Sequence, residues 1–183
     1  MQGHHQQPIR GCRSRSRSAG FTLIELLIVI AIIGIIAALL IPNLLDSLQK
    51  SKQKKTMSEM KSIGTMWFAW YTDERAASAA GQAVAELDWG LYQELEYDDL
   101  FNRLTPIYGT NLARRDGWGH FFEFGERESY EDVLPFGVRS PGSDNEFSDN
   151  LYLVGSFVAT DYQQDIVWAG GHFIRKPGAV QTD

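Results

Sequence analysis

A single carboxylate, Glu25, lies near the start of a segment that is otherwise apolar apart from one threonine. The segment runs from Phe21 to Ile41. An acid inside a membrane segment costs a few kcal/mol, and such residues usually have a specific partner. No Lys, Arg or His lies between Phe21 and Gln49, so no side chain in this stretch can pair with it ionically. Cleavage between Gly20 and Phe21 would create an α-amino group that can pair with Glu25, within one helix or across two neighbouring helices.

A second group of oxygen-bearing side chains lies in the stretch RSPGSDNEFSDN, which ends at Asn150. Its carboxylates are Asp144, Glu146 and Asp149, with serines and asparagines between them. Ligands that are all oxygen suit a hard cation, and an irregular loop suits Ca²⁺ better than Mg²⁺. The spacing is not that of an EF-hand. Composition alone therefore leaves two interpretations open, a calcium site and a solvated acidic turn, and it favours the turn.

The remaining side chains have no arrangement typical of catalysis. Outside the first 20 residues the histidines are His120 and His172, each after a glycine in a strand-like run. No H-x-x-x-H spacing, nucleophile elbow or phosphate-binding glycine loop accompanies them. The sole cysteine, Cys12, precedes Gly20, so the chain after it can form no intramolecular disulfide. We predict that these histidines lie at the surface or on edge strands and that the protein is not an enzyme.

The apolar segment has the length of a membrane anchor. Phe21–Ile41 would span roughly 31 Å as a helix, about the thickness of a bilayer core. It is too long for the apolar region of a cleaved signal peptide and has no small-residue cleavage site after it. Pro42 follows it, where a helix would kink or stop. Residues 1–20 hold the arginines Arg10, Arg13, Arg15 and Arg17 and no acid.

The chain of 183 residues can hold one modest domain in addition to the anchor. Its net charge is −6, and the part after the basic leader is more acidic still. An acidic body is a poor general binder of nucleic acid, because affinity for phosphates needs clustered Lys and Arg.

Residues 44–71 are expected to continue the helix, because apolar residues recur there at three- and four-residue steps. Four aromatic residues near its end are predicted to lie in the core of a small head. A short helix should precede Pro106, and the stretches 119–124, 133–138, 151–159, 165–170 and 172–176 have the composition of strands. These elements predict an α+β fold, with a long helix packed on a small antiparallel sheet. The repeating apolar residues are Leu45, Leu48, Met57, Met60, Ile63, Trp67 and Trp70, and the aromatic residues are Trp67, Phe68, Trp70 and Tyr71.

The N-terminal residues resemble the signature of type IV prepilins and type II secretion pseudopilins. The matching stretch is GFTLIELLIVIAIIGIIAALLIPN, with Gly20 before the cut, Phe21 after it, Glu25 at the fifth mature position and Pro42 at the twenty-second. The resemblance implies that a prepilin peptidase cleaves after Gly20 and N-methylates Phe21. It also implies that Glu25 guides each subunit into a helical filament. The corresponding divisions are a leader (1–20), a membrane and filament-core segment (21–42), an amphipathic helical segment (43–80) and a head (81–183).

The head resembles that of the major pseudopilin of type II secretion, a family with a D-x-W-G turn and an S-x-G-x-D segment followed by acids. The matching stretches are RDGWGHFFEF and VRSPGSDNEFSDN. In that family the second segment binds calcium, so the resemblance shifts the prediction to a Ca²⁺ site here. The metal ligands implied are Ser140, the Pro141 carbonyl, Asp144, Asp149 and Asn150, where Asn150 replaces an acid. Past Asn150 the chain is longer than this family leads us to expect, and the segment 165–178 is predicted to be an added hairpin.

The resemblance implies a structural subunit of a type II secretion pseudopilus, assembled from the inner membrane into a homo-oligomeric filament that drives protein export. The N-terminus would be cytoplasmic and the head periplasmic, before incorporation into a periplasmic or extracellular filament. Expected partners are the prepilin peptidase, an inner-membrane assembly platform, minor pseudopilins and the membrane, and no nucleic acid. The alternatives are a type IV pilin or minor pilin for adhesion, motility or DNA uptake, and a membrane-tethered binding domain.

Overall fold

The computed structural model describes residues 20–75, 86–127 and 134–179. The chain divides into two compact units, Met1–Pro42 and Asn43–Asp183. The expected leader up to residue 19 and the expected boundary between the helical segment and the head, at residues 80 and 81, lie outside the described residues.

One helix, α1, covers Leu23–Arg75 and crosses the boundary between the two units. Pro42 lies inside this helix, so the chain does not leave the helical conformation there. The loss of one backbone hydrogen bond at a proline is therefore tolerated in a helix with strong helix formers on both sides. Residues 44–71 are helical as predicted.

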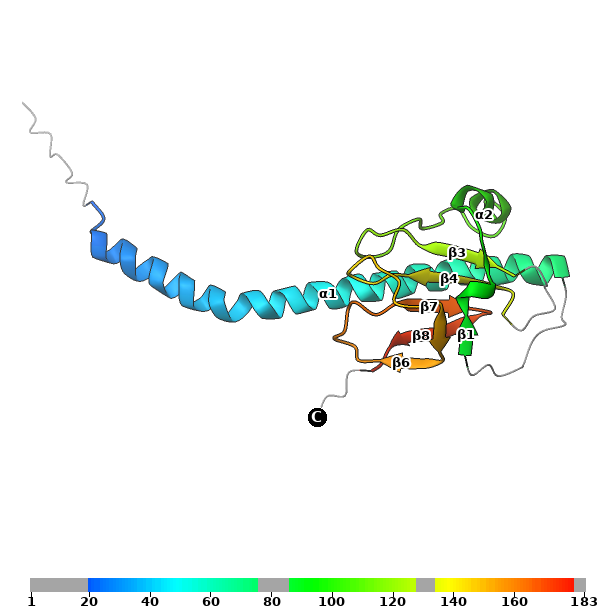
Figure 1. Ribbon diagram of the computed structural model, residues 1–183. Coiled ribbons are helices and arrows are strands. Elements are labelled where there is room, and N and C mark those ends of the chain that lie inside the picture. Colours follow the sequence, from blue (N-terminus) through cyan, green and yellow to red (C-terminus); the bar gives the residue numbers. More distant parts are fainter. Residues whose placement is uncertain (1–19, 76–85, 128–133, 180–183) are drawn as a thin grey trace, which may run out of the picture. The chain divides into compact units, whose positions relative to one another are not determined.

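The second unit contains two sheets, and the C-terminal part of α1 runs along the larger one (Figure 1). The elements after α1 are β1 (Glu86–Asp88), the 3₁₀ turn η1 (Trp89–Leu91), β2 (Gln93–Glu94), α2 (Tyr97–Leu104), β3 (Glu123–Glu126), β4 (Phe136–Ser140), β5 (Leu151–Leu153), β6 (Gly155–Phe157), β7 (Ile166–Ala169) and β8 (His172–Pro177). The short helix α2 ends before Pro106, as predicted.

The larger sheet has the strand order β2-β3-β4-β7-β8-β6, and β1 pairs with β5 in a separate two-stranded sheet. The predicted hairpin is β7 and β8, joined by Gly170 and Gly171. It is part of the main sheet, because β7 pairs directly with β4. The α+β class is confirmed. The sheet is mixed, since β6 runs parallel to β8 while the other pairs in this sheet are antiparallel.

One stripe of α1 forms the core with the sheet. Trp67 stacks on Phe136 of β4 with ring centroids 4.7 Å apart. Gly64 lies against the ring of Trp168, and a Cβ there would come within 2.3 Å of that ring. The buried members of the stripe are Gln53, Thr56, Met60, Ile63, Met66, Trp67 and Tyr71.

Two of the four aromatic residues predicted to be in the core are buried, and two are not. Trp67 and Tyr71 are buried, whereas Phe68 is 45% exposed and Trp70 is half-buried. Phe68 follows Trp67 by one residue, which turns its side chain about 100° around the helix and away from the sheet. Leu45 and Leu48, also predicted in the apolar stripe, are exposed.

Candidate functional site

Glu25 has hydrogen-bonding partners at the start of its own helix. Its Oε2 accepts from the backbone N–H of Thr22 at 2.9 Å and from the Thr22 hydroxyl at 2.7 Å. The Thr22 hydroxyl oxygen in turn accepts from the Glu25 N–H at 3.3 Å. This reciprocal pair is a capping box, which satisfies amide groups that have no partner in the first turn of a helix.

The capping box gives Glu25 a hydrogen-bonding partner beside the ionic one expected from the sequence. No ionic partner exists between Phe21 and Gln49, but Thr22 satisfies part of the hydrogen-bonding capacity of the carboxylate. The T-x-x-E spacing is a known sequence signal for this arrangement and could have predicted it. The role of Glu25 in assembly stays a prediction.

The surface around Glu25 is apolar and exposed. Gly20 and Phe21, the predicted cleavage and methylation residues, are exposed just before α1 begins. The large apolar side chains from Leu23 to Ile41 are each about half exposed or more. Within the described residues, α1 is long and apolar enough to cross a membrane. Such a surface is stable in lipid or against copies of itself, and it is too large for a free surface in water.

The D-G-W-G turn of the head is organised by the buried carboxylate of Asp116. Its Oδ1 accepts from the backbone N–H groups of Trp118, Gly119 and His120 at 2.8–2.9 Å. Its Oδ2 accepts from the hydroxyl of Ser140 at 2.8 Å. Asp116 therefore joins the two motifs that carry the resemblance, the turn and the S-x-G-x-D segment.

The same turn packs against α1 within the second unit. The Gly117 N–H donates to the Thr56 hydroxyl at 2.8 Å, and the Trp118 indole N–H donates to Gln49 at 2.6 Å. A Cβ at Gly117 would lie 2.0 Å from the backbone oxygen of Lys52, so only glycine allows this approach. The turn thus positions the loop that follows Ser140 relative to the helix.

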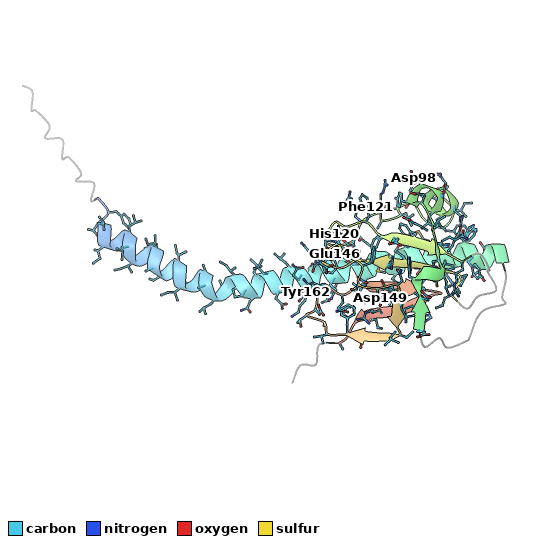
Figure 2. The ribbon with its side chains drawn as sticks, viewed as in Figure 1. Asp98, His120, Phe121, Glu146, Asp149 and Tyr162 are labelled. Carbon is cyan, nitrogen blue, oxygen red and sulfur yellow. The ribbon has the colours of Figure 1, made fainter. Side chains whose placement is uncertain are left out.

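The loop of residues 140–150 starts beside this turn. The His120 ring lies 2.8 Å from the Gly142 carbonyl through its Nδ1, and the Ser143 N–H donates to the Tyr162 carbonyl at 2.8 Å. Tyr162 also donates to Asp46 of α1 at 2.5 Å, and burial raises the pKa of Tyr162 to about 12. Figure 2 shows His120, Glu146 and Tyr162 at this end of the head. His172 is exposed at the start of β8.

Four of the five predicted calcium ligands, Ser140, Asp144, Asp149 and Asn150, have hydrogen-bonding partners within the described residues. The Ser140 hydroxyl donates to Asp116, and Asp144 Oδ1 accepts from the Glu146 N–H at 3.2 Å. Asp149 Oδ1 accepts from the N–H of Asn150 at 2.6 Å, and the Asn150 Oδ1 accepts from Arg139 at 3.1 Å.

A buried arginine lies at the centre of this region. The Arg139 side chain is 7% exposed, and its Nη2 donates to both carboxylate oxygens of Glu123 at 2.9 and 3.0 Å. Its Nη1 donates to the Asp149 carbonyl at 3.3 Å, to Asn150 and to the Tyr152 hydroxyl at 3.1 Å. The partners of Arg139 come from separate parts of the chain, so no spacing in the sequence indicates its role.

Asp165 is the buried acid beneath the loop. Its Oδ2 accepts from the Ser148 N–H at 2.9 Å and from the Tyr152 hydroxyl at 2.8 Å. Its Oδ1 is buried and accepts no hydrogen bond from the described residues. Burial raises the pKa of Asp165 above its ordinary value, and the charge of Asp144 raises it further, while Arg139 and the hydrogen bonds lower it. Burial likewise raises the pKa of Tyr152.

The donor set of the loop does not fit the calcium site expected from the sequence. Within residues 20–75, 86–127 and 134–179, no three His, Cys, Asp or Glu side chains form a group that could hold a metal ion. Two of the expected ligand positions, Asp149 and Asn150, already face the guanidinium of Arg139. Calcium binding stays a prediction of the resemblance.

The N-terminal residues match a known sequence family. Residues 15–41 match the prokaryotic N-terminal methylation motif. This range contains Gly20, Phe21 and Glu25, the residues singled out from the sequence. No solved structure matches the chain significantly.

Three relatives illustrate the similarity of the longer sequence. The type IV major fimbrial protein FimA of Dichelobacter nodosus is 47% identical over 121 residues, covering 54% of this chain and 76% of that protein. The type II secretion system core protein G of Pectobacterium carotovorum subsp. carotovorum is 39% identical over 88 residues, covering 45% and 56%. The type IV major pilin protein PilA of Myxococcus xanthus (strain DK1622) is 41% identical over 66 residues, covering 36% and 30%. The chain thus spans only about a third to just over half the length of the last two relatives.

Proposed function

Because this chain belongs to the superfamily of type IV pilins and type II secretion pseudopilins, we propose that it is a structural subunit of a type II secretion pseudopilus. Subunits assemble from the inner membrane into a helical filament that drives protein export. The observation that carries the proposal is the exposed apolar segment of α1 with one carboxylate, Glu25, placed four residues after the methylation-motif residue Phe21. Similarity to core protein G of type II secretion supports the secretion system over other filaments.

Processing by a prepilin peptidase prepares the subunit for assembly. Cleavage after Gly20 exposes the amino group of Phe21, which the enzyme methylates. Before this step the leader lies in the cytoplasm and the head in the periplasm, with residues 21–42 in the inner membrane. After it, the subunit leaves the membrane for a periplasmic or extracellular filament.

Pairing between Glu25 and the Phe21 amine of a neighbouring subunit selects the register of assembly. Two opposite charges in a low-dielectric filament core attract strongly, whereas an unpaired carboxylate is costly there. In the single subunit, the two hydrogen bonds from Thr22 lower that cost by satisfying one carboxylate oxygen. The other oxygen remains available for the incoming amine.

The subunit works mechanically and performs no catalysis of its own. Its partners are other copies of the chain, the prepilin peptidase, an assembly platform in the inner membrane and minor pseudopilins. The energy for assembly comes from a separate cytoplasmic ATPase.

A second candidate function is that of a type IV pilin, favoured by the similarity to FimA over 76% of that protein. Deletion of this chain in its native host separates the two. A secretion subunit predicts loss of exported proteins from the medium with surface pili retained. A type IV pilin predicts loss of surface pili with secretion retained.

The first test of the proposal is the intact mass of the chain isolated from cells with a prepilin peptidase. We expect a species that begins at N-methylated Phe21. A Gly20→Ala variant should remain unprocessed, with its leader attached. A mature chain that starts at another residue would contradict the proposal.

The second test measures filament incorporation of Glu25 variants by shearing and sedimentation. Glu25→Gln keeps the side-chain oxygen that accepts from Thr22 but removes the charge, and Glu25→Ala removes both. In both variants the Phe21 amine of the neighbouring subunit loses its carboxylate partner, and an unpaired charge there costs a few kcal/mol. We therefore expect incorporation of both variants to fall by about tenfold or more. Normal incorporation of Glu25→Gln would show that Glu25 acts through the cap and not through pairing with the amine.

A further inference from the structure

We propose that the guanidinium of Arg139 is the structural cation of the 140–150 loop, in place of a divalent metal ion. The head would then fold, and keep this loop closed, without calcium. Arg139 and its partners lie in the head, so this role does not depend on whether the filament belongs to secretion or to pili.

Arg139 connects the two ends of the loop. It lies in β4, one residue before Ser140, where the loop begins. Its Nη1 donates to the carbonyl of Asp149 at 3.3 Å and to the side-chain oxygen of Asn150 at 3.1 Å, where the loop ends. One side chain therefore joins both ends of the loop, which is the task expected of the metal ion.

The positive charge is matched inside the head. Both carboxylate oxygens of Glu123, in β3, accept from Nη2 of Arg139 at 2.9 and 3.0 Å, a charge-assisted contact through a single nitrogen. The same carboxylate accepts from the indole N–H of Trp89 at 2.8 Å, which fixes its orientation. A buried arginine with a fixed carboxylate partner is stable, whereas an isolated buried charge is not.

Two aromatic rings enclose the guanidinium. Its central carbon lies 4.0 Å from the ring centroid of Phe147 and 4.6 Å from that of Trp89. Phe147 belongs to the loop and Trp89 to η1, so the loop closes over the cation with an apolar side chain. Planar guanidinium groups stack well on aromatic rings, and lysine does not replace them there.

A hydrogen-bond chain extends from Arg139 to the middle of the loop. Tyr152 accepts from Arg139 at 3.1 Å and donates to Asp165 at 2.8 Å, and Asp165 accepts from the N–H of Ser148. The network thus holds the loop at residues 148, 149 and 150.

Calcium and Arg139 compete for the same acceptors. A calcium ion needs oxygen ligands within about 2.3–2.6 Å, and the carbonyl of Asp149 and the oxygen of Asn150 are already engaged by a positive group. A divalent cation beside this guanidinium would also be repelled. Binding of calcium would therefore require the Arg139 side chain to leave its buried place.

The first experiment uses the full processed chain in detergent micelles. Its thermal unfolding is followed by near-ultraviolet circular dichroism with millimolar Ca²⁺, with Mg²⁺ and with chelator, and calcium is titrated calorimetrically. We expect the same Tm under the three conditions and no heat of binding. A Tm raised by about 5 °C or more by Ca²⁺ and not by Mg²⁺ would overturn the proposal.

The second experiment replaces the arginine and a matched control. Arg103 also pairs with a carboxylate, Glu126, and lies over an aromatic ring, Trp70, away from the loop. We expect the Tm of Arg139→Met to be lower than that of Arg103→Met by about 5 °C or more, because it removes the guanidinium that joins Glu123 to the end of the loop. Equal Tm values for the two variants would contradict the proposal. If Arg139→Met does not fold, Arg139→Lys is measured in its place. This variant keeps the charge but loses the planar fork and the stacking, so its Tm should be lower than that of the wild type. A wild-type Tm for Arg139→Lys would also contradict the proposal.

Discussion

Carboxylates lie beside apolar side chains both at the start of α1 and next to the acidic loop of the head. The two regions differ in where the partners of these carboxylates come from. At Glu25 a local cap from Thr22 satisfies one oxygen, and the surrounding apolar surface is exposed. In the head, Glu123 has a buried arginine and an indole as partners. The first region leaves its interactions for another molecule to complete, whereas the second completes most of them within the chain, with Asp165 Oδ1 and Arg139 Nε the atoms of this network left without a hydrogen bond among the described residues.

This difference predicts which property a substitution in each region should change. Changes at Glu25 should affect assembly while leaving the unfolding of the head unchanged, because its described partners lie in the first turn of α1. Changes in the head should lower the stability of its fold first. A head variant that folds normally but fails to assemble would break this division.

The largest effect on the head is expected from Asp116→Ala. The buried carboxylate accepts from Trp118, Gly119, His120 and Ser140, and its loss removes all four of these hydrogen bonds, with the Gly119 N–H keeping the backbone carbonyl of residue 116. We expect the free energy of unfolding to fall by about 3 kcal/mol or more. Chemical denaturation of the full chain in detergent measures it.

Asp161→Ala is the matched control for Asp116→Ala, because its carboxylate accepts from one nearby side chain, that of Gln164. Its effect should stay within about 1 kcal/mol. Equal losses for the two variants would mean that Asp116 does not organise the turn.

A smaller loss is expected from Gly117→Ala, which tests the contact between the turn and α1. The added Cβ would meet the Lys52 backbone oxygen at 2.0 Å, so the turn must move away from the helix. We expect a loss of about 2 kcal/mol, measured by the same denaturation. Gly155→Ala provides the control, since nothing lies within 4 Å of its Cβ position. A stable Gly117→Ala with an unstable Gly155→Ala would place the sensitive contact elsewhere.

The features that depend on local pattern could be predicted from the sequence. The length of α1, the helix before Pro106 and the β7–β8 hairpin follow from apolar periodicity, proline and glycine, which act over a few residues. Strands β1 and β2 were not predicted, because three and two residues are too short to show alternation.

The features that depend on tertiary contacts could not be predicted. Arg139 meets Glu123, Trp89 and Asn150, which lie on three different elements, so no spacing along the chain indicates it. The acids of the loop suggested a metal because composition shows the negative charges and not the buried cation beside them. Glu25 differs, since its partner Thr22 lies three residues away and the signal for the cap was present in the sequence.

The smallest predicted effect concerns the pH dependence introduced by Asp165. Because burial raises its pKa in the folded state above the ordinary value of 3.8, the folded chain binds more protons than the unfolded chain in the interval between the two pKa values. The contribution of this group to stability therefore falls as pH rises through that interval.

Asp165→Asn removes the titration and keeps an oxygen that can accept from Tyr152. We expect the Tm of the variant relative to the wild type to rise by a few degrees from about pH 4 to about pH 7. The same comparison with Asp161→Asn provides the control and should give a flatter curve. A Tm difference for Asp165→Asn that is constant with pH would mean that the network around Tyr152 and Arg139 holds this carboxylate ionised throughout. Asp165 would then be stabilised by partners within the head, as Glu123 is.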